Sequence, residues 1–255
     1  MHPLLAIVAF VAGVYAMGKG GAAVVSQGIH VTLATGETLL AAPSLLLLAL
    51  SGIPFLVGLS LKPITARTAL LSALAGATLW AASLGLMNMQ FALWRPPTEY
   101  LDYFRALHQL LRPHTLGEGI LSILAIGLMP ALCEETVFRG VVLPSFARAG
   151  PVAGLLGSSV LFALIHIDPL GHSVVFHRLP FAFAVGLGLA ALRLLTGSLV
   201  PSMVAHATLN TITFATVFLS GAASEAMEQP QVLSGSLLLL GGGAATAWLF
   251  RALRR

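Results

Sequence analysis

The stretch Glu134-Glu135-Thr136-Val137-Phe138-Arg139 places three charged side chains inside a long apolar run. This run extends from about residue 116 to residue 147, which is long enough to cross a lipid bilayer as a helix. Ionisable groups are costly within a membrane, and where they occur there they usually mark a function. The stretch therefore indicates a membrane-spanning helix that carries a buried polar site.

The rest of the chain has the composition of an integral membrane protein. Of its 255 residues, 57% are hydrophobic and 9% are charged, and the mean hydropathy is +0.94. A soluble domain carries about a quarter of charged residues, so that class is excluded. Apolar runs broken by Gly, Pro and charge predict an all-α, polytopic integral membrane protein with about eight transmembrane helices. These lie near residues 3–25, 39–61, 68–94, 116–147, 151–170, 179–195, 199–220 and 233–250.

The segment 95–115 differs from the predicted spans because it mixes apolar and charged residues. Its apolar positions Tyr100, Phe104, Leu107 and Leu111 recur at helical spacing, opposite the charged positions. This pattern favours one interfacial helix near 95–115 over a solvated loop. The polar residues Asp168, His172, His177 and Arg178 fall between two predicted spans, where a solvated loop is the expectation.

The charges also bear on orientation and partners. With both termini in the cytoplasm, the predicted inner loops and tail hold seven Lys and Arg residues and the outer loops hold five, a modest positive-inside bias. All acids outside the 134–135 pair, Glu37 among them, then fall on the outer side. The 13 basic residues are scattered and form no basic stripe, so a nucleic-acid partner is not expected. The Ala, Leu and Gly richness favours a bacterial inner membrane.

Two further motifs join the first, Phe162-Ala163-Leu164-Ile165-His166 and His206-Ala207-Thr208-Leu209-Asn210. Positions i and i+4 share a helix face, so each motif presents its two polar or aromatic end residues together. The same rule pairs Glu135 with Arg139, with the acid N-terminal as is favourable for an ion pair. Glu134 points elsewhere, and is predicted to be the free carboxylate.

These side chains suit peptide hydrolysis. Glu134 and His166 are equidistant from the predicted turn at Gly150-Pro151, so an antiparallel hairpin would place them at the same depth. Together they could hold and deprotonate a water. His206 and Asn210 could donate hydrogen bonds to an oxyanion. Alternatively Glu134, His166 and His206 could hold a catalytic zinc ion, although the short zincin motif His-Glu-x-x-His is absent.

The three motifs in this order resemble the CPBP family of intramembrane proteases (CAAX protease and bacteriocin-processing, also called Abi), which includes the Ras-converting CAAX endopeptidases. The family pattern E-E-x-x-x-R, F-x-x-x-H and H-x-x-x-N is met at every fixed position. The resemblance implies an eight-helix membrane fold with an endopeptidase site open to the membrane. It implies that Glu134 and His166 activate the water and that His206 and Asn210 stabilise the oxyanion. Supporting roles fall to Glu135, Arg139 and Phe162.

The prediction is therefore an intramembrane endopeptidase that cleaves a membrane-associated protein or peptide near its C-terminal or membrane-proximal part. We expect a single membrane domain, 1–255, with a catalytic core at about 116–220. Family members are described both as metalloproteases and as metal-independent glutamate proteases. No separate set of metal ligands is evident, which favours the latter and no cofactor, with zinc as the alternative. The protein could be a bacterial member of the myxosortase type, which removes C-terminal sorting tails.

Two other function classes remain open at this stage. Intramembrane acids and histidines could form a proton relay in a transporter, but related halves with matching broken helices are not visible. A membrane immunity or scaffold protein with a vestigial site is the third reading. Such a protein has no reason to retain all four predicted catalytic side chains.

Overall fold

The computed structural model describes residues 2–167, 173–216 and 231–254. Every regular element in this part of the chain is helical, which confirms the all-α prediction. The elements before the motif-bearing run are α1 (Pro3–Val24), η1 (Val25–Gln27), α2 (Ile29–Leu50), α3 (Phe55–Gly58), α4 (Ala66–Leu93) and α5 (Thr98–Leu111). Those after it are α9 (Pro151–Leu164), η5 (Ser173–Arg178), α10 (Leu179–Thr196), α11 (Val200–Phe214) and α13 (Val232–Leu253).

The motif-bearing run itself is one continuous helical segment, Leu116–Ala149, with two π-helical stretches. Its parts are α6 (Leu116–Ser122), π-helical η2 (Ile123–Leu128), α7 (Met129–Glu135), π-helical η3 (Thr136–Val142), α8 (Leu143–Phe146) and η4 (Ala147–Ala149). The first motif thus begins at the end of α7 and continues through η3. Wider π-helical turns occur mostly as single insertions in α-helices and often at functional sites.

Six helices among the described residues are long and apolar enough to cross a membrane. They begin at Pro3, Ile29, Ala66, Leu116, Phe176 and Val232. The helix α9 is apolar but has only 14 residues, and the end of the predicted span 199–220 lies outside the described residues. The protein is therefore an integral membrane protein, whereas the predicted count of about eight spans is not confirmed.

The second predicted span, 39–61, is wrong by about ten residues at each end. The helix α2 starts after Gly28, whose φ of 103° ends the preceding turn, and it stops at Leu50 before a turn through Gly52. The chain beyond it is a loop that contains the single-turn α3. The error arose because the polar residues after Gly28 favoured a loop, although they belong to the first turns of the helix. Glu37, predicted in an outer loop, consequently lies inside α2.

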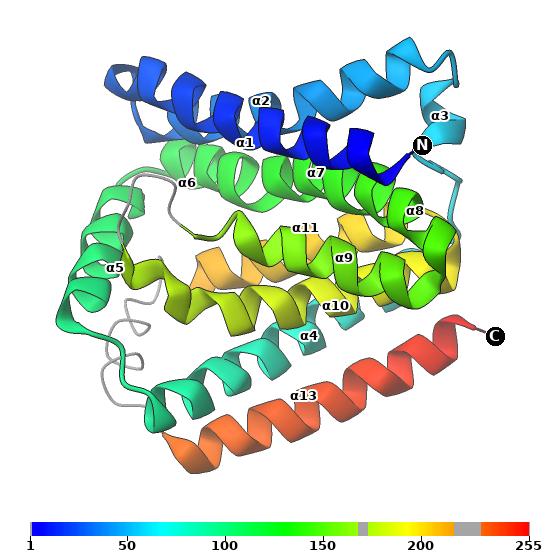
Figure 1. Cartoon of the computed structure of the whole chain (residues 1–255). Coiled ribbons are helices and arrows are strands. Elements are labelled where there is room, and N and C mark those ends of the chain that lie inside the picture. The colour runs from blue at the N-terminus through cyan, green and yellow to red at the C-terminus, as the bar shows by residue number, and fades with distance from the viewer. Residues whose placement is uncertain (1, 168–172, 217–230, 255) are drawn as a thin grey trace.

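The helices form a layered bundle (Figure 1). The hairpin α1–α2 covers one side of the run from α6 to α8, and the pair α4–α13 lies on the opposite side. Between them, α9, α10 and α11 fill the middle, where α10 packs on α9 and α11 packs on α4. The turn at Gly150-Pro151 connects η4 with α9 as predicted, with Gly150 at a φ of 117°. The amphipathic α5 lies across one end of the bundle, far from both termini.

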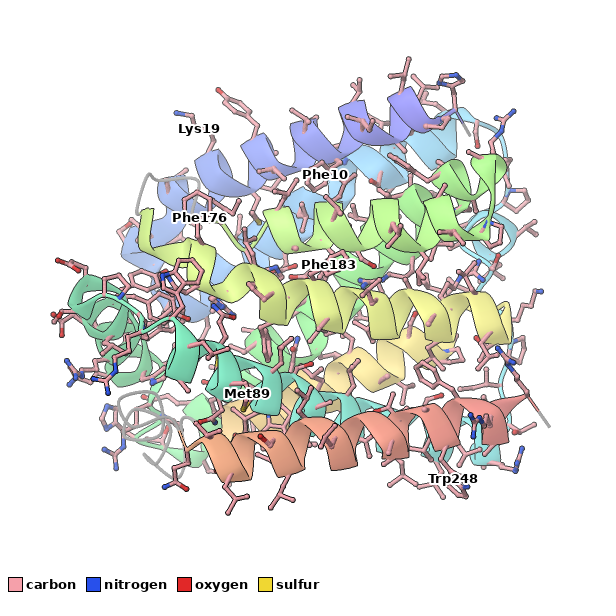
Figure 2. All side chains as sticks on the ribbon, turned by 60° about the horizontal axis from the view of Figure 1, so that its bottom comes forward. Phe10, Lys19, Met89, Phe176, Phe183 and Trp248 are labelled. Atoms are coloured by element: carbon pink, nitrogen blue, oxygen red, sulfur yellow. The ribbon has the colours of Figure 1, made fainter. Side chains whose placement is uncertain are left out.

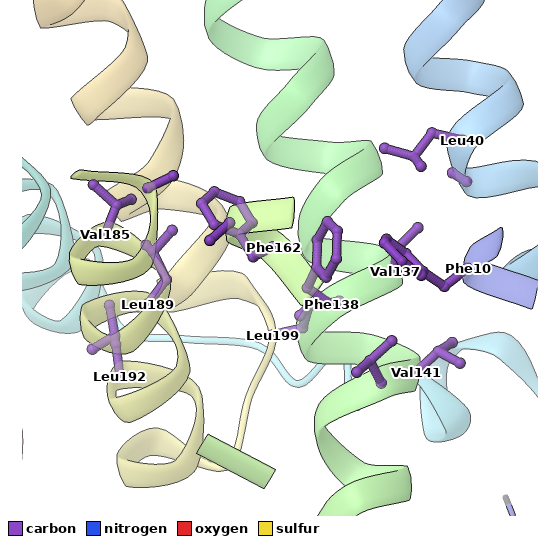
Figure 3. Close-up of a cluster of buried hydrophobic side chains, with 14 of the residues drawn as sticks. Phe10, Leu40, Val137, Phe138, Val141, Phe162, Val185, Leu189, Leu192 and Leu199 are labelled. Atoms are coloured by element: carbon purple, nitrogen blue, oxygen red, sulfur yellow. The ribbon is translucent and has the colours of Figure 1, made fainter. Parts of the chain in front are cut away.

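The core sits around the first motif. Phe138 and Phe162 stack edge to face with ring centroids 5.3 Å apart, and apolar side chains of α10 surround them on one side (Figure 3). On the other side Val137 meets Phe10 of α1. Large apolar side chains also cover the outer faces, as shown by Trp248 on α13 and Phe176 near the α5 end (Figure 2). Such outward apolar surface suits a lipid environment.

Candidate active site

The first motif contributes a buried ion pair. One Nη of Arg139 donates to Oε1 of Glu135 over 2.7 Å, and neither side chain is exposed. The other Nη donates to the backbone carbonyl of Gly186 on α10, over 2.9 Å. The predicted pairing of Glu135 with Arg139 is thus confirmed. Arg139 also fastens the motif helix to α10.

His206 on α11 lies between the two glutamates. Its Nδ1 is 3.0 Å from Oε1 of Glu135, and its Nε2 is 3.9 Å from Oε2 of Glu134. An ionised carboxylate only accepts hydrogen bonds, so Nδ1 of His206 must carry the proton. In the neutral ring, Nε2 is then an acceptor that faces Glu134. His206 can donate from Nε2 only as the imidazolium.

His166, two residues past the end of α9, also uses its Nδ1 for a hydrogen bond. Its Nδ1 lies 2.9 Å from the backbone oxygen of Phe162, and since a carbonyl cannot donate, Nδ1 carries the proton. The Nε2 lone pair of His166 is left to act on a substrate or a water. The hydrogen bond fixes the ring within its own helix turn.

Phe162 holds the site together from the middle. Its ring centroid is 5.0 Å from that of His166 and 5.8 Å from that of His206. The Arg139 guanidinium lies 4.5 Å above the same ring, within range of a cation–π interaction. The supporting role predicted for Phe162 has this geometric basis: one aromatic ring contacts all three groups.

The polar side chains open onto one cavity of about 590 Å³. All four predicted catalytic residues line it, so the fold brings together groups from three separate helical segments. Most of the remaining wall is apolar, from α2, α4, α5, α10 and α11. The predicted catalytic side chains at the cavity wall are Glu134, His166, His206 and Asn210.

Two cavity residues were missed by the sequence reasoning. Glu37 of α2 lines the cavity, and its Oε2 is enclosed without a hydrogen-bond partner, as is Oε2 of Glu134. The run 29–50, apolar apart from His30, one acid and scattered hydroxyls, could have revealed an intramembrane carboxyl. Arg178 directly precedes α10 and also lines the cavity, and the adjacent His177 is buried. The expectation of a solvated loop was wrong for these two residues, and Asp168 and His172 lie outside the described residues.

The side chains of the site that could bind a metal ion are Glu134, His166 and His206. Zinc sites need three or more protein ligands that converge on one ion. Over residues 2–167, 173–216 and 231–254, no three His, Cys, Asp or Glu side chains are grouped to hold one ion. The Nδ1 atoms of both imidazoles are engaged, so only the Nε2 atoms and Glu134 could contribute, and these do not form such a group.

A known protein family matches the part of the chain that carries the three motifs. Residues 116–212 fit the family described as Rce1-like, type II CAAX prenyl endopeptidase Rce1-like. This segment is similar to Rce1-like proteins. No curated protein and no solved structure matches the chain significantly.

The Rce1-like segment contains all three motifs and runs from the start of α6 into α11. The resemblance to CAAX proteases drawn from the motifs is thereby confirmed, and the family is one of membrane proteases. Glu37 and α5 complete the cavity from outside the Rce1-like segment. Part of the cavity wall is therefore built by chain that the family model does not describe.

Proposed function

We propose that this protein is an intramembrane endopeptidase that hydrolyses a peptide bond near the C-terminal or membrane-proximal part of a membrane-associated protein or peptide. One observation carries the proposal: a carboxylate, two imidazoles and a carboxamide from three helical segments converge on one largely apolar cavity. The Rce1-like match over the same segment supports it. A peptide in this cavity would be separated from bulk water, with hydrolytic groups at its wall.

The proposed reaction begins with a water between Glu134 and His166. Glu134 accepts a proton from the water while the lone pair of His166 Nε2 accepts a hydrogen bond from it and orients it. The water oxygen attacks the carbonyl carbon and forms a new C–O bond. The π electron pair of the C=O bond moves to the carbonyl oxygen, which becomes the oxyanion. Glu134 then returns the proton to the departing amine nitrogen as the C–N bond breaks. The products are a carboxylic acid and an amine, and transfer of the remaining water proton between them gives the carboxylate and the ammonium.

The oxyanion requires donors on its side of the cavity. The Asn210 amide donates without a change in protonation, whereas His206 must be the imidazolium because its Nδ1 proton is directed at Glu135. In that state Glu134 and Glu135 balance Arg139 and His206, two negative charges against two positive ones. A neutral group of charges is what an apolar environment favours. This balance supports the oxyanion role for His206.

We propose that no metal takes part and that both termini are cytoplasmic in a bacterial inner membrane. The arrangement of the described residues supports the first part, since no three of their His, Cys, Asp or Glu side chains are grouped to hold one ion. Exhaustive chelation followed by metal analysis of the purified protein tests it. Full peptidase activity at metal contents far below one ion per chain is expected. Activity that disappears and returns with zinc would overturn this mechanism.

The decisive experiment is cleavage of a candidate tail peptide by the protein in detergent or vesicles, compared across variants. Glu134→Gln and His166→Ala should each lower kcat by roughly 10²–10⁴-fold, the usual range for general acid–base groups. Asn210→Ala should lower it by about 10²–10³-fold, as for other oxyanion donors. Cys133→Ala is the matched control, since Cys133 adjoins Glu134 but does not line the cavity. Cleavage that survives Glu134→Gln would exclude the mechanism.

A further inference from the structure

The charges in the cavity are distributed unevenly. The two carboxyls, Glu37 and Glu134, enter from α2 and α7. Arg178 enters at the start of α10, beside the α5 helix that lies across the end of the bundle. The cavity thus has a cation in its wall in addition to the groups assigned to hydrolysis.

Arg178 has no acidic partner in the described part of the chain. Its described contact is with the ring of Phe104 on α5, whose centroid lies 5.2 Å from the guanidinium carbon. A cation–π contact uses the face of the guanidinium and leaves its edge N–H groups able to bind an anion. Arginine keeps its charge at every physiological pH, so in a largely apolar wall it favours a negatively charged occupant.

Two titratable neighbours of Arg178 on α5 add no charge of their own. Burial and the charge of Arg178 lower the pKa of His108 on α5, so this imidazole is neutral at pH 7. Burial raises the pKa of Tyr100 to about 12, so its phenol is neutral too. His166 also lies within electrostatic range of Arg178. The cation is therefore close to the hydrolytic groups and next to neutral side chains on α5.

We propose that Arg178 binds the free C-terminal carboxylate of the substrate and thereby determines which peptide bond reaches Glu134. The inference rests on the proposed function. A peptide tail that enters the cavity carries one anion whatever its sequence, its terminal carboxylate. An arginine–carboxylate pair is a strong, often bidentate contact.

The proposal also explains how a largely apolar cavity selects a cleavage position. An extended peptide advances by about 3.3–3.6 Å per residue. Once the terminal carboxylate is held at Arg178, the peptide bond that reaches Glu134 is set by counting residues back from the terminus. Side chains of the tail then meet mainly apolar wall, which discriminates only weakly among them.

The test uses one tail peptide made with a free C-terminal carboxylate and with a C-terminal amide. The wild-type protein should cleave the acid with a kcat/KM at least about tenfold higher, as expected for loss of a charge-assisted hydrogen bond. Arg178→Gln should bring this ratio close to one, mainly by raising KM for the acid, and Arg178→Lys should restore part of it. Arg95→Gln, an exposed arginine at the end of α4, should leave the ratio unchanged.

A second measurement needs only the wild-type protein and so does not depend on the variant's folding. Lengthening the peptide by two residues at its C-terminus should move the cleaved bond two residues toward the new terminus. Equal cleavage of acid and amide, or a cut that stays fixed in sequence, would overturn the inference and leave the peptidase function intact. Activity that follows the phosphatidylglycerol content of vesicles but not the terminal carboxylate would assign Arg178 to a lipid headgroup. Cleavage of neither peptide would count against the proposed function.

Discussion

At the residue scale, the two imidazoles show how hydrogen bonds decide chemistry that the residue type leaves open. Both His166 and His206 use Nδ1 for a hydrogen bond, to the backbone in one case and to Glu135 in the other. Both therefore present Nε2 to the cavity side of the site. His206 differs because the partner of its Nδ1 is a buried carboxylate, so that in the proposed mechanism it donates from Nε2 as the imidazolium. The two histidines can thus perform opposite roles, one accepting and one donating.

The buried group of Glu135, Arg139 and His206 provides the residue-scale prediction. Glu135→Gln should destabilise the protein by about 3–5 kcal/mol, because it leaves the buried Arg139 charge without its partner. Arg139→Met should cost a similar amount for the reciprocal reason. The double variant removes both charges and should be clearly more stable than the sum of the single losses implies. Unfolding in mixed detergent, followed by tryptophan fluorescence, measures all three.

A double variant whose loss equals the sum of the two single losses would show that Glu135 and Arg139 do not stabilise each other. Ser158→Ala is a suitable control, since Ser158 is equally buried but lies outside this group of charges. Activity should be lost in Glu135→Gln even where folding is retained, because the buried anion to which His206 Nδ1 and Arg139 donate is removed.

The sequence anticipates contacts within one helix better than contacts between helices. Glu135 and Arg139 are four residues apart, so helix geometry alone predicts their pairing. The hydrogen bond between His206 and Glu135 joins residues 71 positions apart, and only the packing of α11 against α7 creates it. The motifs predicted which side chains gather, through their resemblance to a family. They did not reveal that His206 is shared between two glutamates, or that Glu37 and Arg178 line the same cavity.

At the element scale, helix ends depend on packing that hydropathy does not report. The predicted spans 68–94, 179–195 and 233–250 agree closely with α4, α10 and α13, because charge, Pro or Gly bounds each apolar run. The span predicted at 39–61 failed because polar side chains near the start of α2 can face other helices and the cavity instead of water. The glycine triplet Gly241-Gly242-Gly243 shows the same dependence on packing, because only Gly242 lies against another helix, while a Cβ on Gly241 or Gly243 would meet nothing within 4 Å.

That triplet gives the element-scale prediction. A Cβ on Gly242 would lie 2.6 Å from the backbone nitrogen of Ala82 and 2.8 Å from the oxygen of Thr78, both on α4. Gly242→Leu should therefore force α13 away from α4 and cost several kcal/mol, as overpacking does at its worst. Gly241→Ala and Gly243→Ala meet nothing within 4 Å and should be neutral or stabilising by up to about 1 kcal/mol. Thermal unfolding in detergent distinguishes them, and equal effects at all three positions would contradict the packing.

At the scale of the whole molecule, the positions of the termini and of α5 indicate the side of the membrane from which a substrate would enter the cavity. Both termini lie at one end of the bundle and α5 lies at the other (Figure 1). The cavity is lined by α5 residues and by Arg178, so these groups lie toward the α5 end. With both termini cytoplasmic, that end faces the opposite side of the membrane. A substrate tail bound at Arg178 would then be presented from the non-cytoplasmic face.

This orientation can be measured because the chain has a single cysteine. In a Cys133→Ala background, new cysteines at His2, Arg254 and Asp102 would sit at exposed positions near the two ends of the bundle. A membrane-impermeant thiol reagent added to intact cells should label the Asp102→Cys variant, because the proposed orientation places α5 on the outer side. The His2→Cys and Arg254→Cys variants should react only after the membrane is opened, since the fold places both termini at the same end. Labelling of His2→Cys and Arg254→Cys from opposite sides would contradict the bundle itself, whereas labelling of both from outside would reverse the orientation while leaving the fold intact.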